Sequence, residues 1–244
     1  MQQHMAYSMA KKTMKQGAKR GTGQAAKGRR AAQPKPGLLA AQLTKIAREF
    51  HGRGWALGTS GNYSAVLNAN PLRLLITSSG LDKSALTERD FLEIDGAGNI
   101  LAGKGKPSAE TFLHLAVAGK REVGCILHTH SVWSTLLSER FASQGELCIS
   151  GYEMLKGLQG VRTHEHRERV PIFANAQEIP ALANKISNGL GRENQTHGFL
   201  LSGHGLYTWG VDVAQARRHV EIFEFLLEVI GRREFGGAPV TEKQ

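Results

Sequence analysis

The sequence contains few cysteines, no long hydrophobic segment and no acidic residue among its first 35 positions. Two cysteines in 244 residues cannot form a disulfide framework, so a disulfide-stabilised scaffold is excluded. No uninterrupted apolar run approaches the roughly 18 residues that a membrane-spanning helix needs. The N-terminus also lacks the apolar core of a secretory signal. We therefore expect a protein of the reducing cytoplasm that does not span a membrane.

The positive charge is concentrated at the N-terminal end of the chain. The formal net charge is +10, and residues 1–35 contain nine lysines and arginines, which leaves 22 basic and 21 acidic residues in 36–244. The basic segment is rich in glycine, alanine, glutamine and lysine, and it has too few large apolar residues to bury a core. Composition therefore predicts a basic, disordered leader at residues 1–36 and a nearly neutral domain after it.

The sequence leaves several interpretations of this leader open. One interpretation is a disordered tail, and another is a start codon placed too early, with Met5, Met9 and Met14 as other candidate starts. A third is a transit-like targeting segment. A fourth is a region that contacts RNA or a membrane through its positive charge. Because the rest of the chain is nearly neutral, we expect no specific nucleic-acid partner and no membrane partner.

Residues 37–235 are predicted to form one domain, followed by a short tail at 236–244. Apolar residues at helical spacing predict helices that begin near Leu39 and near Ala216. Short apolar runs bounded by turn residues predict β-strands. These strands are expected at 64–67, 72–77, 91–95, 99–102, 123–127, 199–201 and 206–209. These elements lack the regular βαβ period of a Rossmann fold. They favour an α/β domain with a mixed or antiparallel sheet and helices on its faces.

Two histidines, His128 and His130, directly follow the buried strand predicted at 123–127. Residues i and i+2 of an extended chain point to the same side, so both imidazoles can reach one metal ion. Histidine nitrogen suits Zn²⁺ and similar metals, and three protein ligands leave a position open for a substrate. Among the other histidines, His204 is the best candidate for the third ligand, because the glycines on either side let the backbone approach closely.

The remaining histidines have simpler explanations. His164 and His166 lie in a charged stretch with no apolar residues before it, which is typical of a solvated loop. We expect His114 to be a packing residue on a helix, His197 to begin a strand, and His219 to be exposed beside two arginines.

Three short segments combine glycine with hydroxyl side chains, at residues 58–62, 77–80 and 106–108. Such loops expose backbone N–H groups and short hydroxyls, which suit a phosphate oxyanion. None fits the Walker pattern, and no Gly-x-Gly-x-x-Gly opens a helix after a strand. Each segment alone is typical of a turn, but three of them before the histidine pair favour a phosphate site.

Two carboxylates lie near these features. Glu110 is in the first turn of a predicted helix that runs to Lys120 and has Ser108 as its expected N-cap, where the helix dipole stabilises a negative charge whatever its function. Glu153 lies near another predicted helix start. From the residues alone, either side chain is a candidate catalytic acid or base.

The order of these motifs resembles the class II (zinc) aldolase/epimerase family. The segments are 58–62 (GTSGN), 76–80 (ITSSG), 106–110 (KPSAE), 128–130 (HTH) and 203–205 (GHG). Within that family, 152–157 (YEMLKG), 170–172 (VPI) and 204–210 (HGLYTWG) most resemble the methylthioribulose-1-phosphate dehydratases of methionine salvage. The resemblance covers residues 40–233 and leaves the leader unmatched.

The resemblance implies a mixed α/β domain on a central, largely antiparallel sheet, assembled as a homotetramer. It implies one Zn²⁺ per subunit, held by His128, His130 and His204. It also implies a sugar-phosphate substrate whose phosphate is bound by loop residues, namely Thr59, Asn62, Ser79, Gly80 and Ser108. The expected reaction converts 5-methylthioribulose 1-phosphate to 2,3-diketo-5-methylthiopentyl 1-phosphate and water.

The resemblance assigns the acid–base role to different residues in different branches of the family. The aldolases use the position of Glu110, whereas the dehydratases use the position of Glu153. We expect Glu153 to be the main acid–base residue, because capping or a phosphate loop already accounts for Glu110. Two alternatives stay open: an aldolase or epimerase on the same scaffold, and a basic-tailed binding protein whose histidine pair is structural.

Overall fold

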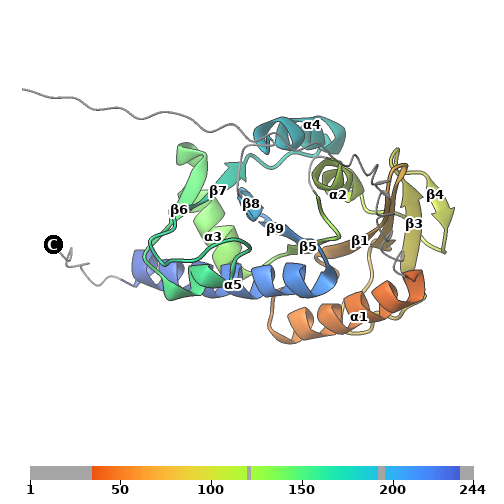
Figure 1. Ribbon diagram of the computed structural model, residues 1–244, viewed down its shortest axis with the longest axis horizontal. Helices are drawn as coiled ribbons and strands as arrows, with labels where there is room; N and C mark the ends of the chain where they lie inside the picture. The colour runs from red at the N-terminus through yellow and green to blue at the C-terminus, as the bar shows by residue number, and fades with distance from the viewer. Residues whose placement is uncertain (1–34, 120–121, 192–195, 237–244) are drawn as a thin grey trace, which may run out of the picture. The chain divides into compact units, whose positions relative to one another are not determined.

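The computed structural model describes residues 35–119, 122–191 and 196–236, and the fold is given for these residues (Figure 1). The helices are α1 (Pro36–Gly52), α2 (Thr111–Ala118), α3 (Val132–Arg140), α4 (Ile179–Gly189) and α5 (Val213–Phe235), with 3-10 turns η1 (Ala142–Gln144) and η2 (Glu153–Gly157). The strands are β1 (Asn62–Ala69), β2 (Leu72–Thr77), β3 (Phe91–Asp95), β4 (Ile100–Ala102), β5 (Cys125–Thr129), β6 (Glu146–Ile149), β7 (Glu168–Phe173), β8 (Gly198–Leu201) and β9 (Gly205–Gly210).

The strands of the described residues form one nine-stranded sheet in the order β4-β3-β2-β1-β5-β9-β8-β7-β6. The pairs are antiparallel except for β7 and β8, which run parallel. Helices pack on both faces, α1 and α5 on one and α2 and α4 on the other (Figure 1). The predicted fold class, a single mixed α/β domain with a largely antiparallel central sheet flanked by helices, is confirmed.

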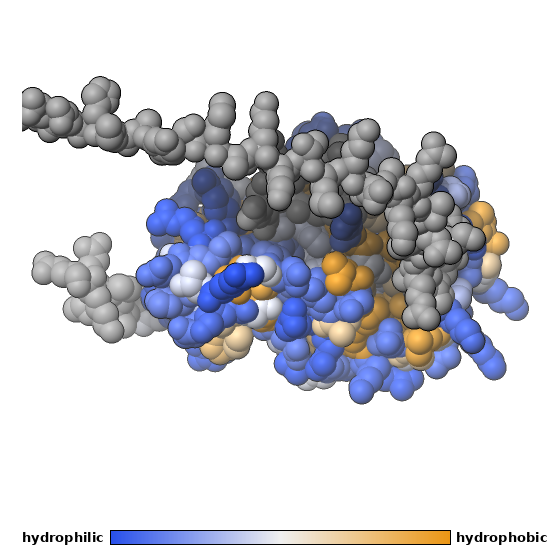
Figure 2. All heavy atoms as spheres, in the orientation of Figure 1, coloured by the Kyte–Doolittle hydropathy of each residue, from blue (hydrophilic) through white to orange (hydrophobic). Residues whose placement is uncertain are grey.

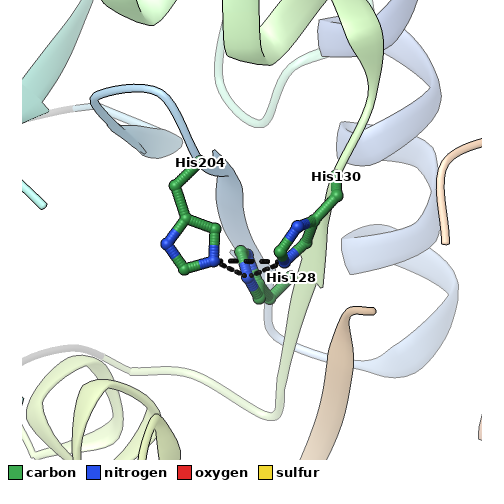
Figure 3. A group of neighbouring side chains, drawn as sticks. All are labelled: His128, His130 and His204. Carbon is green, nitrogen blue, oxygen red and sulfur yellow. Dashed lines mark hydrogen bonds between the residues drawn. The ribbon is translucent and has the colours of Figure 1, made fainter. Parts of the chain in front are cut away.

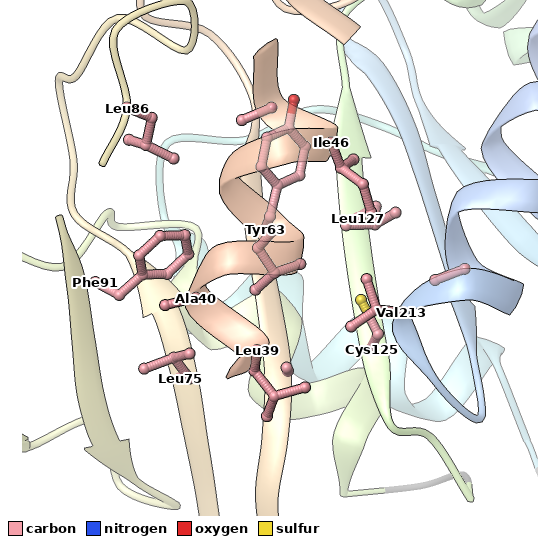
Figure 4. Packing of buried hydrophobic residues seen from close by; sticks show 14 of the residues in the cluster. Leu39, Ala40, Ile46, Tyr63, Leu75, Leu86, Phe91, Cys125, Leu127 and Val213 are labelled. Carbon is pink, nitrogen blue, oxygen red and sulfur yellow. The ribbon is translucent and has the colours of Figure 1, made fainter. Parts of the chain in front are cut away.

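The central strand β5 shows how the sheet separates its two cores. Cys125 and Leu127 pack into the cluster beneath α1 and α5, with Tyr63 and Val213 beside them (Figure 4). Ile126 belongs to the cluster under α2 and α4. All five residues of the strand are buried. This alternation is the period of two that places His128 on the same face as Ile126.

Several details differ from the sequence-based expectations. The chain forms β6, β7 and α3, which the apolar pattern did not separate from loops. Helix α2 begins at Thr111 rather than at Ser108, because residues 108–111 form a turn closed by a hydrogen bond from Thr111 N to Ser108 O. It ends at Ala118, and Lys120 lies outside the described residues.

His219 is buried rather than exposed. It lies on the inner face of α5, its Nδ1 is 2.7 Å from Trp209 O, and its Nε2 accepts a hydrogen bond from Gln159 N. The neighbouring arginines suggested that His219 is exposed to solvent, but on α5 its side chain points towards the protein interior.

The ends of the chain complete the description. Helix α1 starts at Pro36, which suits the first helical position because its fixed φ is already helical. The predicted leader at 1–36 and tail at 236–244 lie almost wholly outside the described residues. None of the helices that are described is long and apolar enough to cross a membrane. The face in Figure 2 is mainly hydrophilic, with hydrophobic side chains in separate patches.

Candidate metal centre and active site

Three histidines meet where β5 ends and β9 begins. His128 is on β5, His130 directly follows that strand, and His204 lies in the turn between β8 and β9. Antiparallel pairing places Thr129 opposite Leu206, so the turn before β9 lies beside the end of β5. Sheet register therefore brings together side chains that are 76 residues apart.

The Nε2 atoms of the three rings face one another (Figure 3). The distances are 2.8 Å between His128 and His130, 3.3 Å between His128 and His204, and 3.2 Å between His130 and His204. Nδ1 of His128 lies 2.9 Å from Leu206 O, and donation there leaves the Nε2 lone pair available. One ligand atom from each ring lies within 4.8 Å of the others, so these three side chains could hold a metal ion.

Burial favours the neutral form of these rings. It lowers the pKa of His128 well below the ordinary value, and neighbouring histidines lower it further. Burial and the charge of His204 lower the pKa of His130 to about 4. Neutral imidazole is the form that ligates metals. The donor set, three converging neutral nitrogens with one ring wholly buried, therefore fits a metal of the Zn²⁺ type.

The glycines beside His204 are required by this geometry. Gly203 has a φ of +64°, which residues with a side chain rarely adopt. A Cβ on Gly205 would lie 2.2 Å from Thr129 O and 3.1 Å from Cε1 of His128. The expectation that glycine lets the backbone approach closely here is confirmed.

Tyr207 is a site residue that the sequence analysis did not identify. Its ring stacks on His128 with centroids 3.8 Å apart and planes at 12°. Burial and the charge of Glu110 raise its pKa well above the ordinary value. It lies directly opposite His128 in the β5–β9 ladder, so only the strand pairing could have indicated it.

Glu110 is the carboxylate that the structure places against the histidines. Its Oε1 lies 3.0 Å from His204 Nε2, and its Oε2 lies 3.7 Å from His128 Nε2. Burial raises the pKa of Glu110, but its hydrogen bond with His204 and the charge of His128 outweigh burial, so the pKa is well below the ordinary value. Glu110 occupies the N-cap position of α2 without making a side-chain capping bond. Capping therefore does not explain this residue.

A chain of buried polar side chains orients Glu110. Asn62 Nδ2 donates to Glu110 Oε2 at 2.6 Å, and Asn62 Oδ1 pairs with Nε2 of His114. Nδ1 of His114 lies 2.7 Å from Ser64 Oγ, and burial lowers the pKa of this histidine to about 4. His114 is buried as expected for a packing residue, but it also positions Asn62, which in turn donates to the carboxylate.

The predicted phosphate residues surround one cavity of about 110 Å³ next to the histidines. Its lining contains all five of them, and they are Thr59, Asn62, Ser79, Gly80 and Ser108. Glu110 and His130 line the same cavity, so it connects the hydroxyl loops with the histidine cluster. Lys83 also lines it and was not identified from the sequence, because a single lysine in a polar loop gives no signal.

Glu153 lies elsewhere on the surface. Its side chain is 71% exposed, and its charged partners are Lys156 at 2.8 Å and His164 at 3.3 Å. The hydrogen bond from Lys156 lowers the pKa of Glu153. Of the two predicted catalytic glutamates, only Glu110 lies within 4 Å of the histidine cluster of its own chain, against His204 and His128.

Comparisons with known proteins relate most of the chain to one family. The sequence profile of the Class II Aldolase and Adducin N-terminal domain matches residues 41–230. The chain is 46% identical over 191 residues to methylthioribulose-1-phosphate dehydratase of Methylococcus capsulatus, covering 78% of this chain and 91% of that protein. The identity to the Pseudomonas fluorescens dehydratase of the same name is also 46% over 191 residues, covering 78% and 90%.

A solved structure shares the fold. L-fuculose-1-phosphate aldolase from Thermus thermophilus matches with a TM-score of 0.67 and 22% sequence identity, covering 84% of this chain and 100% of that chain. This likeness shows that the chain and that aldolase share a fold.

Proposed function

The chain belongs to the class II aldolase and adducin family, and from that premise we propose that it is a methylthioribulose-1-phosphate dehydratase. It is then a carbon–oxygen lyase of methionine salvage, which forms 2,3-diketo-5-methylthiopentyl 1-phosphate and water. Identities of 41–46% to curated dehydratases over most of the chain support this substrate. The observation that carries the proposal is the contact between three convergent histidines, Glu110 and a cavity lined by hydroxyl loops.

We assign the metal as Zn²⁺, one per subunit, with His128, His130 and His204 as ligands. When bound, the ion supplies a Lewis acid for a carbonyl oxygen and leaves a coordination position open to substrate. The buried position of His128 and its Nδ1 bond to the backbone fix the ring orientation. The hydroxyl and glycine residues of the cavity hold the substrate phosphate.

In the proposed reaction, the two glutamate carboxylates transfer the protons. Glu110, ionised and oriented by Asn62, takes the proton from C3 of the ketose phosphate. The electron pair left on C3 forms a C3–C4 double bond as the C4 hydroxyl leaves with a proton from an acid, and water is released. The resulting enol on C3 becomes the second ketone when a proton is added at C4.

Glu153 is the second carboxylate of the proposal, and we propose that it acts on the site of a neighbouring copy of the chain. The 71% exposure of its side chain supports this role, because an exposed carboxylate is accessible to another subunit of the proposed homotetramer. Desolvation on docking raises a carboxyl pKa, which suits an acid that protonates the leaving hydroxyl. The exposed Met154 next to it offers apolar area for such a contact.

A mixing experiment tests this arrangement. Glu153→Gln and His130→Ala are purified separately, then unfolded and refolded together. If Glu153 acts across subunits, mixed oligomers contain sites with an intact metal centre from one chain and an intact glutamate from the other, so activity returns. If refolded wild-type protein is active but the mixture is not, the across-subunit role is wrong.

The main alternative is an aldolase or epimerase, because Glu110 and the histidines would serve that chemistry too. Mass spectrometry after incubation of the metal-analysed protein with methylthioribulose 1-phosphate separates the cases. Loss of one water molecule supports the dehydratase, and two smaller fragments support an aldolase. A structural role of the histidine pair predicts no turnover and no bound metal.

A further inference from the structure

Lys83 is the buried cation of the cavity beside the histidines. It lies in the loop between β2 and β3, its side chain is 1% exposed, and it lines the cavity together with Thr59 and Ser79. A lysine is almost never fully buried unless its charge is compensated. This position therefore calls for a physical explanation.

The hydrogen bonds of Lys83 satisfy only part of its ammonium group. Nζ donates to Thr59 O at 3.1 Å and to Leu81 O at 2.8 Å. An ammonium has three N–H donors, so one more remains for another acceptor. Both acceptors are backbone carbonyls, and the bond to Thr59 O joins the loop at 58–62 to the loop that carries Lys83.

No carboxylate compensates the charge of Lys83 at close range. None of the ion pairs found within residues 35–119, 122–191 and 196–236 includes this lysine. The neighbouring Asp82 accepts hydrogen bonds from N and Oγ of Ser84 instead. Burial lowers the pKa of Lys83, although the charge of the nearby Asp82 acts in the opposite direction. A buried charge without a counterion is costly, and an anion that enters the cavity removes that cost.

The ammonium of Lys83 lies in the same cavity as residues of the histidine site. Lys83 and His130 line the same cavity, which also contains Ser79 and Ser108. Glu110, the negative group of the cavity, is engaged by Asn62 and His204. Lys83 thus supplies positive charge among the hydroxyl loops, next to the histidine cluster.

We propose that Lys83 is the counterion of the substrate's phosphate group and makes the site selective for phosphorylated over neutral sugars. The inference rests on the proposed function for the identity of the substrate. A phosphate monoester carries about two negative charges at neutral pH. The third N–H of Lys83 donates to a phosphate oxygen, and the loop hydroxyls satisfy the other oxygens.

The first test measures binding of inorganic phosphate to the full chain by calorimetry. Lys83→Gln removes the charge and retains a donor for one backbone carbonyl. It should weaken phosphate binding by about 30-fold or more, as expected for truncation of a buried charge pair. Lys104→Gln, an exposed position outside the cavity, makes the same charge change and should bind as the wild type does. Equal affinity of wild type and Lys83→Gln, or no binding to wild type, overturns the proposal.

The second test separates a phosphate contact from a general structural role. Lys83→Gln should lower kcat/KM for methylthioribulose 1-phosphate by a similar factor, mostly through KM, and should lower any kcat/KM for unphosphorylated methylthioribulose far less. Equal losses for both substrates contradict the proposal. A Lys83→Met variant and thermal unfolding without phosphate identify any loss caused by misfolding. If no substrate turns over but phosphate binding still depends on Lys83, the proposed dehydratase function fails and the anion site stands.

Discussion

Two clusters in this molecule combine histidines with a glutamate, and they differ in what the ring nitrogens face. In the cluster at the end of β5, the Nε2 atoms of His128, His130 and His204 point at one another. In the second cluster, at the start of β7, His166 and His197 point at the buried carboxylate of Glu168. The residue types are the same. In the first cluster the Nε2 lone pairs are available to a metal ion, whereas in the second cluster the ring nitrogens are bonded to oxygen atoms.

The second cluster is satisfied by hydrogen bonds. Glu168 lies 2.8 Å from His166 Nε2 and 3.1 Å from His197 Nδ1, and it accepts a bond from His197 N at 2.8 Å. Nε2 of His197 lies 2.8 Å from Gln159 O. Because each nitrogen named here has an oxygen partner, this cluster connects β7 with the residue before β8 and with the loop that contains Gln159. The comparison teaches that convergence of nitrogens, rather than the presence of histidine, indicates a metal.

The largest expected difference between the clusters is in bound metal. His130→Ala should lower the metal content sharply and remove turnover, because two nitrogens cannot hold the ion as three do. His166→Ala should leave the metal content unchanged. Elemental analysis of the purified variants checks both expectations. A double variant, His128→Ala with His130→Ala, that still binds one metal per chain would falsify the assignment.

The glutamates of the two clusters should differ next in their effect on catalysis. Glu110→Gln should lower kcat by about 10²–10⁴ and retain the metal, because the amide keeps the shape but cannot take a proton. Glu168→Gln should keep kcat in the folded protein. Steady-state kinetics on metal-loaded enzyme measure the difference. Full turnover by the Glu110 variant, together with loss in Glu153→Gln, would assign the proton transfer to Glu153 alone.

Stability should show the opposite order. Glu168→Gln replaces a fully bonded buried carboxylate and should cost about 1–3 kcal/mol in the free energy of unfolding at neutral pH. The hydrogen bonds and charge of His197 lower the pKa of Glu168 below its ordinary value of 4.5, against the effect of burial. The unfolded chain therefore binds the proton more readily, and this stabilisation is present above pH 4.5 and is lost as the pH falls further.

Denaturant unfolding at pH 7 and at pH 4 measures this effect. The difference in the free energy of unfolding between wild type and Glu168→Gln should be smaller at pH 4 than at pH 7. A larger difference in the free energy of unfolding at pH 4 than at pH 7 would show that Glu168 is not held as the ionised partner of the two histidines.

The smallest expected effect comes from the basic leader. The residues named in the two clusters lie between positions 110 and 204, and the matched family domain begins at residue 41. Deletion of residues 1–34 should leave metal content, kcat and oligomeric state unchanged while lowering the isoelectric point. Size-exclusion chromatography and kinetics of the shortened chain check this, and a large drop in kcat would place the leader in the site or the assembly.

Much of the fold followed from periodicity. The strand predicted at 91–95 matches β3, and the strand predicted at 72–77 matches β2, because both are short apolar segments bounded by turn residues. Strands β6 and β7 were not separated from loops, since Glu146, Glu168 and Arg169 interrupt the apolar pattern. Their charges are accommodated by specific partners, an ion pair between Arg169 and Glu146 and the two histidines around Glu168.

The site divides in the same way. The sequence by itself determined that His128 and His130 share a face, because strand geometry alternates side chains with a period of two whatever surrounds them. It also determined which loops carry hydroxyls and glycine. Only the tertiary structure decided that Tyr207 stacks on His128, that Glu110 rather than Glu153 meets the histidines of its own chain, and that Lys83 is buried in the same cavity. These contacts depend on strand register and loop packing across dozens of residues, and no local pattern encodes a distance between side chains so far apart in the chain.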